Sequence, residues 1–151
     1  MYTKTLKELE HTIKMIDPPR LKPLPVDKWL SSSILQKSVR RMDTITAQRA
    51  TWTLWHQDKK SLWRRLHVLA LEDCGVASPD AVVKALIVAN ATAWRSKIGD
   101  LQVSLYITRI LCEADKTRFA DEVYTACDRS PEYRSLRAKL SVDRKSTRLN
   151  S

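Results

Sequence analysis

Apolar residues recur every three to four positions along most of the chain, which is the spacing of amphipathic helices. Residues 2–16 predict a short helix of this kind, with charged side chains opposite an apolar face formed by Leu6, Leu9, Ile13 and Ile16. Residues 17–25 then contain four of the six prolines, which prevent a helix and favour an extended arm. This arm is either a linker or a strap that docks on the helices.

Residues with good capping properties precede the next apolar segments. Three consecutive serines stand before a predicted helix over residues 34–42, and Asp43 or Thr44 stands before a second helix. Asp58 is expected to cap a third, which should end at Gly75 because glycine suits the left-handed conformation of a C-terminal cap.

The following segment is the most apolar of the chain. Ser78 should cap a helix in which only three residues interrupt the apolar side chains from 81 to 94, and such a helix belongs at the centre of a bundle. Another helix follows Gly99, and Thr117 and Ser130 should open two more. With only two glycines, a sheet with tight turns is disfavoured. We therefore predict an all-α fold, a compact bundle of five or six helices after an extended N-terminal arm.

Three parts are expected along the chain: an N-terminal helix with the proline-rich arm (1–30), a helical domain (31–142) and a non-native tail (143–151). The tail, DRKSTRLNS, has no apolar periodicity and resembles a translated sequencing adapter, because GAT CGG AAG AGC ACA CGT CTG AAC TCC encodes its nine residues in order. The gene would then come from an assembled environmental (metagenomic) read that lacks the true C-terminus beyond residue 142. The alternative is a genuine basic tail.

The chain is basic, with 27 lysines and arginines against 17 acidic residues and a net charge of +10. Without the tail, which carries three basic side chains and one acidic one, the net charge is +8. Such a charge favours acidic or polyanionic partners without choosing between them. The N-terminus lacks the continuous apolar core of a signal peptide, and no run approaches the roughly 18 apolar residues of a membrane span. We therefore expect a cytoplasmic protein with no membrane contact.

Two acidic residues, Glu72 and Asp73, stand in the last turn of a predicted helix, where the helix dipole disfavours negative charge. Their position suggests basic partners. Two arginine pairs are available, and Arg65 lies two turns before Glu72 on the same helix. The structural ion-pair candidates are therefore Arg40, Arg41, Arg64, Arg65, Glu72 and Asp73. A nucleic-acid or protein contact is the alternative role for these residues.

Three segments around these residues, QKSVRR (36–41), LWRRLHVLALEDCGVASPDAV (62–82) and ALIVANA (85–91), resemble a known family. They are similar to the C-terminal helical domain of the replication-associated recombination ATPases, the RarA or MgsA family. The matching positions are Lys37, Ser38, Arg40, Arg64, Arg65, Leu66, Ala70, Glu72, Asp73, Gly75, Ala77 and Pro79. Cys74 and Ser78 depart from the family pattern, and a looser similarity continues to residue 127.

The resemblance implies a helical oligomerisation domain related to the collar domains of clamp loaders. In the family this domain follows an ATPase core, but the sequence contains no G-x-x-x-x-G-K-[ST] phosphate loop. We therefore expect a non-enzymatic association module without the ATPase core, carried by a phage or another mobile element and acting with DNA replication and recombination machinery. A protein partner or self-association is expected, and contact with DNA is the additional option.

Aromatic and basic side chains also alternate over residues 49–65, a composition that can stack bases while holding phosphates. The candidates for nucleic-acid or partner contact are Arg49, Trp52, Trp55, Lys59, Lys60 and Trp63. Core packing is the alternative for the tryptophans. Two further functions stay open: a small anti-CRISPR-like inhibitor of a host defence nuclease, and a stand-alone nucleic-acid-binding protein.

No constellation for catalysis, metal or cofactor binding stands out. The three cysteines and three histidines have none of the spacings of zinc sites, and no nucleophile with a nearby base is evident. An odd number of cysteines without a C-x-x-C pair is typical of reduced thiols. We expect no enzyme activity, no metal, no cofactor and no small-molecule substrate.

Overall fold

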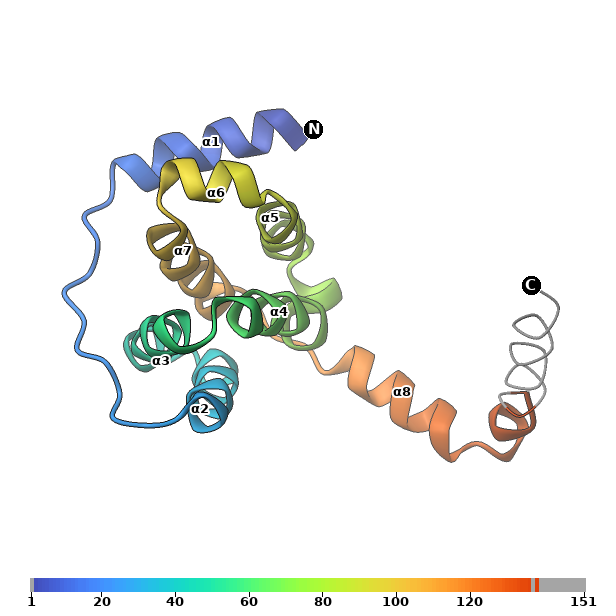
Figure 1. Cartoon of the computed structure of the whole chain (residues 1–151). Helices are drawn as coiled ribbons and strands as arrows, with labels where there is room; N and C mark the ends of the chain where they lie inside the picture. The colour runs from blue at the N-terminus through green and yellow to red at the C-terminus, as the bar shows by residue number, and fades with distance from the viewer. Residues whose placement is uncertain (1, 137, 139–151) are drawn as a thin grey trace, which may run out of the picture. The chain divides into compact units, whose positions relative to one another are not determined.

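The computed structural model describes residues 2–136 and 138, and every regular element among them is helical (Figure 1). The all-α prediction is confirmed. The chain forms two units, residues 1–117 and 118–151. The α-helices are α1 (Tyr2–Lys14), α2 (Lys28–Arg40), α3 (Thr44–Gln57), α4 (Lys59–Leu69), α5 (Pro79–Asn90), α6 (Thr92–Ile98), α7 (Asp100–Glu113) and α8 (Phe119–Arg129).

The first unit surrounds one shared apolar core. Its largest fully buried side chains come from six helices, α1 to α5 and α7, because each contributes aliphatic residues spaced by three or four positions. They include Ile13, Leu35, Val39, Leu54, Leu62, Leu66, Leu69, Val88, Val103, Ile107 and Leu111.

The N-terminal helix is part of this core, contrary to the expected division at residue 30. α1 packs on α5 and α7 and buries Leu6, Leu9 and Ile13, the apolar face that its sequence predicts. The expected boundary is also wrong because residue 30 lies inside α2, which begins at Lys28. Burial of an amphipathic face thus joins α1 to the helical domain.

α2 begins earlier than the serines suggested. The Asp27 carboxylate accepts a hydrogen bond from the backbone N–H of Leu30 at 2.8 Å and caps the helix, so the serines lie within it. By contrast, Asp43 and Asp58 cap α3 and α4 as predicted, through bonds from the N–H groups of Thr46 and Ser61. Hydrogen bonds from these two residues hold the pKa of Asp43 and of Asp58 below its usual value.

The long apolar segment from 81 to 94 is two helices rather than one, because the chain breaks at Ala91 between α5 and α6. Only Ala81, Ala85 and Val88 of α5 are buried, so the expected central helix, apolar on all sides, is wrong. The break adds a helix: α2 to α8 and the helical segment over residues 131–136 follow the arm within the described residues, instead of five or six helices. Arg95 occupies the end of α5 that the break leaves open.

The proline-rich arm is a docked strap. Its backbone runs extended from the end of α1 to the start of α2 (Figure 1). Two hydrogen bonds hold it on α3. The Leu24 N–H donates to Oγ1 of Thr53 at 2.8 Å, and Arg49 Nε donates to the Lys22 carbonyl at 2.9 Å. Proline leaves backbone carbonyls without helical partners, and α3 supplies side-chain donors for them.

The second unit contains α8 and a further helical segment over residues 131–136. α8 has no buried residue, and its apolar positions include Phe119, Val123 and Tyr124. The expected helical domain of 31–142 is therefore divided at residue 117. The tail expected at 143–151 lies outside the described residues.

Gly75 occupies a backbone conformation that other residues rarely adopt. α4 continues as a π-helical turn, Ala70–Cys74, and the chain then turns at Gly75 with φ +45° and ψ −131°. A Cβ atom here would stand 3.3 Å from Cγ2 of Thr117. We expect Gly75→Ala to lower the free energy of unfolding by about 1–3 kcal/mol in urea denaturation. A loss below about 0.5 kcal/mol would show that the turn relaxes without strain.

Candidate nucleic-acid interface

Helices α2 and α4 pack against each other and together contain seven lysines and arginines and no acidic residue. In α4 the residues Leu62, Leu66 and Leu69 face the core, which directs Arg64 toward solvent and leaves Arg65 at the edge. The basic residues of the two helices are Lys28, Lys37, Arg40, Lys59, Lys60, Arg64 and Arg65. The packing of two helices that lack acids concentrates the positive charge of the chain.

A groove of about 240 Å³ lies between these helices. Three cationic side chains, two hydroxyls, one indole and one aliphatic side chain line it: Lys28, Arg64, Arg65, Ser32, Ser61, Trp29 and Val68. We call it the α2–α4 groove. It offers ammonium and guanidinium donors next to an aromatic surface.

The two arginines of the groove are held differently. Arg65 Nε donates to Oγ of Ser32 at 2.8 Å, which ties α4 to α2 and orients the rest of the guanidinium. Arg64 is exposed, and neither arginine forms an ion pair with an acid in the part of the chain that the structure describes. Their charges are thus available to an anionic ligand.

The third cation is partly neutralised. Lys28 Nζ lies 3.3 Å from Oδ2 of Asp58 and 5.3 Å from the centre of the Trp29 ring. The Ser61 hydroxyl donates to the same Asp58 oxygen at 2.9 Å. Counting this carboxylate against the three cations, the α2–α4 groove keeps an excess of two positive charges.

The exposed tryptophan is Trp29, not one of the tryptophans that the sequence singled out. Its side chain is 76% exposed, whereas Trp63 is 8% exposed. Trp52 and Trp55 are half-buried, and both contact the His56 ring. The aromatic part of the predicted surface over residues 49–65 is therefore wrong for Trp63, which packs in the core. A helix start at Lys28 rather than residue 34 would have placed Trp29 in an exposed first turn.

The three predicted basic contact residues, Arg49, Lys59 and Lys60, have different surroundings in the structure. Arg49 is occupied by the arm. Lys59 Nζ lies 3.9 Å from the centre of the Trp55 ring, and Lys60 is exposed in the first turn of α4. Neither Lys59 nor Lys60 forms a hydrogen bond or an ion pair in the described region, and Lys60 lies one turn before Arg64 on the same helix.

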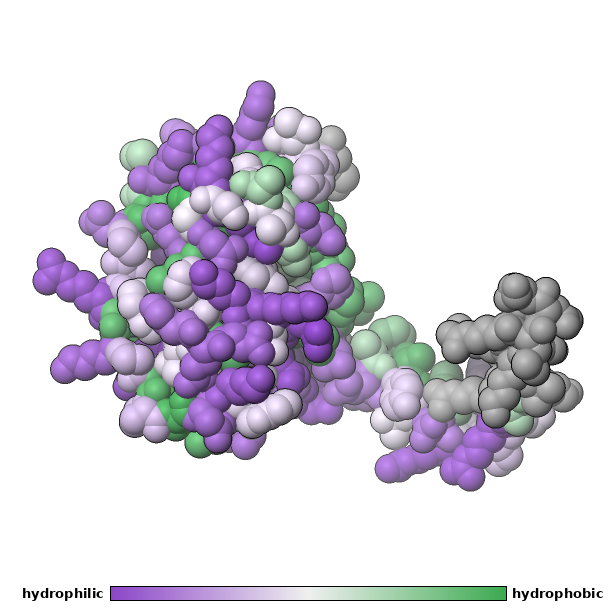
Figure 2. All heavy atoms as spheres, in the orientation of Figure 1, coloured by the Kyte–Doolittle hydropathy of each residue, from purple (hydrophilic) through white to green (hydrophobic). Residues whose placement is uncertain are grey.

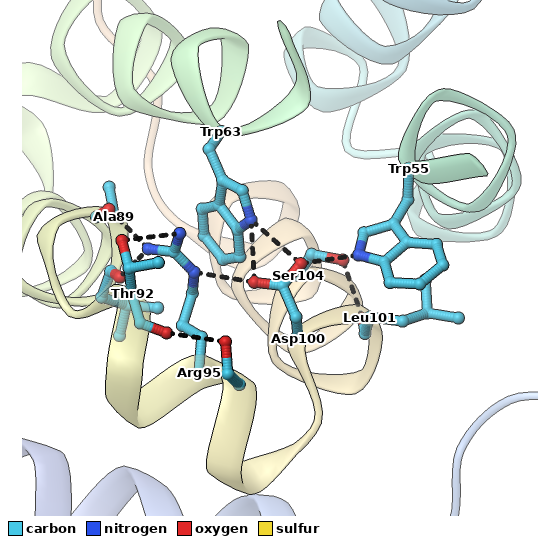
Figure 3. A network of polar contacts seen from close by, with 10 residues as sticks. Trp55, Trp63, Ala89, Thr92, Arg95, Asp100, Leu101 and Ser104 are labelled. Atoms are coloured by element: carbon cyan, nitrogen blue, oxygen red, sulfur yellow. Dashed lines mark hydrogen bonds and ion pairs between the residues drawn. The ribbon is translucent and has the colours of Figure 1, made fainter. Parts of the chain in front are cut away.

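A buried polar network explains why two of the tryptophans point inward (Figure 3). The Asp100 carboxylate accepts hydrogen bonds from Nε1 of Trp55 at 2.7 Å and from Nε1 of Trp63 at 3.2 Å. Arg95, whose guanidinium stacks 4.0 Å from the Trp63 ring centre, donates from Nε to Asp100 at 2.8 Å. Its Nη1 donates to the carbonyls of Val88 and Ala89 at the end of α5. The sequence analysis missed both Arg95 and Asp100 as partners.

Of the two acids that the sequence singled out, Asp73 has a basic partner and Glu72 has none in the described residues. Arg40 Nε lies 2.6 Å from Oδ1 of Asp73, whose side chain is 2% exposed. Arg65 contacts Ser32 rather than Glu72, and Glu72 forms no ion pair within the described range. Arg41 and Arg64 are exposed and stay apart from both acids. The pair joins the end of α2 to the π-helical turn after α4.

The described residues offer no alternative site for metal chemistry. No group of three or more histidine, cysteine or acidic side chains comes together in the region covered by the structure. Cys74 and Cys112 are buried, and burial raises the pKa of both thiols, that of Cys112 to about 11. Within the same residues, no helix has the length and apolar character needed to cross a membrane.

No protein-family model matches the chain, and no curated protein matches it either.

Removal of the Arg40 side chain should leave a buried charge without its partner. Oδ2 of Asp73 accepts no hydrogen bond from the described residues, so Arg40 supplies the only side-chain compensation for this carboxylate there. We expect Arg40→Ala to reduce the free energy of unfolding by about 3–5 kcal/mol. The matched control is Arg41→Ala, an exposed neighbour that should change it by less than about 0.5 kcal/mol. Equal effects in urea denaturation would exclude a special role for the Arg40–Asp73 pair.

The Asp100 network predicts loss of stability in acid. Burial raises the pKa of Asp100, but hydrogen bonds from Arg95, Trp55 and Trp63 outweigh this effect and leave the pKa below its usual value. Its contribution to stability is therefore present above the unfolded pKa of about 4 and is lost as the pH falls through the folded value.

Thermal melts of the Asp100→Asn variant check this contribution. We expect a lower melting temperature at neutral pH and a smaller further drop between about pH 5 and pH 2 than in the wild type. Asp80→Asn is the control, since the Asp80 side chain is 79% exposed. Parallel pH profiles for the Asp100→Asn variant and the wild type would argue against the network.

Proposed function

We propose that this protein is a non-enzymatic binding module that holds nucleic acid in the α2–α4 groove. The observation that carries the proposal is the convergence of Lys28, Arg64 and Arg65 on one groove that also contains the Ser32 hydroxyl, which accepts from Arg65 and can donate its own proton. Phosphate groups accept hydrogen bonds from guanidinium and hydroxyl groups, and each phosphate neutralised by a cation releases counterions.

The distribution of charge supports a polyanion rather than a single acidic side chain as the ligand. Lys60 stands one turn before Arg64 on α4 and is exposed, so it continues the positive charge along that helix. On the face of residues 2–117 in Figure 2, hydrophilic side chains cover most of the surface and hydrophobic ones occur in small groups.

The resemblance to the C-terminal domain of the replication-associated recombination ATPases supports a role beside DNA replication and recombination machinery. In this proposal a collar-type helical module from a phage or another mobile element brings DNA to a protein partner or to further copies of itself. An inhibitor of a host nuclease is the second candidate, since a basic groove also suits an acidic protein face. It predicts binding to the nuclease without binding to nucleic acid.

Charge reversal at Arg64 tests the groove. Arg64 is exposed and forms no hydrogen bond or ion pair in the described residues, so Arg64→Glu should fold normally. We expect it to weaken binding of labelled oligonucleotides about tenfold, and to lower the magnitude of the slope of log K against log[salt] by about one. Fluorescence anisotropy at about 50 mM and about 200 mM salt measures both effects.

Lys7→Glu is the matched control, because it makes the same charge change on α1, a helix that packs on α5 and α7. It should alter affinity much less than Arg64→Glu. The proposal fails if the wild-type protein binds no nucleic acid at about 50 mM salt, or if both variants lose affinity equally.

A further inference from the structure

We infer that the α2–α4 groove takes a single strand of nucleic acid, with one base stacked on Trp29. This inference rests on the proposed function and adds the class of nucleic acid. It depends on the combination of an exposed indole and a concave line of phosphate-binding side chains in the same groove.

Trp29 has the features of a stacking platform. It lies in the first turn of α2, where the cap by Asp27 fixes the backbone. Its side chain is 76% exposed, whereas the other four tryptophans are half-buried or buried. Leaving an indole in water is unfavourable by the hydrophobic effect, and a stacked base would remove that cost. Lys28 Nζ, 5.3 Å from the ring centre, covers part of one face of the indole. A base stacked on the opposite face would therefore lie between the indole and solvent.

The phosphate-binding groups stand beside this platform. Arg64 and Arg65 line the same groove as the indole, and the Arg65 guanidinium is oriented by the Ser32 hydroxyl. In a single strand, each base is followed within one nucleotide by a phosphate, so a base on Trp29 brings the adjoining phosphates to the groove. Proteins that bind single strands without sequence preference combine these two elements, an aromatic platform and a positively charged groove.

A duplex satisfies this arrangement poorly. Its bases are stacked on one another and expose only their edges in the grooves, so an indole can reach a base face only at an end or after unpairing. Its major groove is usually entered by a projecting helix or ribbon, whereas the α2–α4 groove is a hollow between two helices. A duplex would therefore contact the cations that line the groove, but Trp29 would add little to its affinity.

The experiment compares two variants of adjacent residues on two forms of nucleic acid. Trp29→Ala removes the platform, and Leu30→Ala is the matched control because Leu30 is also exposed in the first turn of α2. The probes are fluorescein-labelled oligothymidine of about 15 nucleotides, a duplex of the same length and an oligouridine that distinguishes RNA from DNA. Trp29→Phe keeps a smaller aromatic ring, and melting curves check that all variants fold.

We expect Trp29→Ala to weaken single-strand binding about tenfold and duplex binding by less than about twofold, with Leu30→Ala close to wild type and Trp29→Phe intermediate. Quenching of tryptophan emission by the single strand should also fall in Trp29→Ala. An equal loss on duplex and single strand, or unchanged single-strand binding, overturns the inference while the groove can still bind phosphates. Absence of wild-type binding to all three probes overturns the proposed function itself.

Discussion

The carboxylate of Asp100 joins helices that lie far apart in the sequence. It accepts hydrogen bonds from Trp55 of α3, from Trp63 of α4 and from Arg95 of α6, so four helices meet at the first residue of α7 (Figure 3). Arg95 also donates to the last carbonyls of α5. Burying an ion pair costs desolvation energy, and here hydrogen bonds to both partners offset that cost. The break between α5 and α6 is stabilised by the same guanidinium.

This network determines which surface α4 presents. With Trp63 bonded to Asp100 and stacked on Arg95, the rotation of α4 about its axis is set, and Arg64 must then point outward. The bond from Arg65 to Ser32 fixes the spacing of α4 from α2. The α2–α4 groove is therefore a consequence of interactions made in and beside the core. Because contacts within the chain hold the groove, the proposed binding would need little ordering of these side chains.

The fold also sorts the basic residues into two groups. Arg40, Arg49 and Arg95 are occupied by a buried carboxylate, by the arm and by the Asp100 network, respectively. Arg64 and Lys60 remain exposed. The net charge of +10 already subtracts the acidic partners of Arg40 and Arg95, but it does not indicate which of the remaining cations lie unpaired at the surface. Counting cations in the sequence does not separate these two groups.

By itself the sequence determined the features that depend on neighbours within one or two turns. The amphipathic α1, the caps Asp43 and Asp58 and the extended arm belong here, because capping and periodicity act over three or four residues. The acids at the end of α4 also indicated a basic partner. The tertiary structure decided which basic residue pairs with Asp73, because Arg40 is 33 positions away in the sequence.

Only the tertiary structure decided the break at Ala91, the inward position of Trp63 and the exposure of Trp29. Each depends on contacts between residues distant in sequence, such as the 45 positions between Trp55 and Asp100. An apolar run such as 81–94 is compatible with one helix or two, and the hydrogen bonds that Arg95 donates to the carbonyls at the end of α5 favour two. Local pattern identified the helices, whereas the packing of their side chains decided which charges and rings remain at the surface.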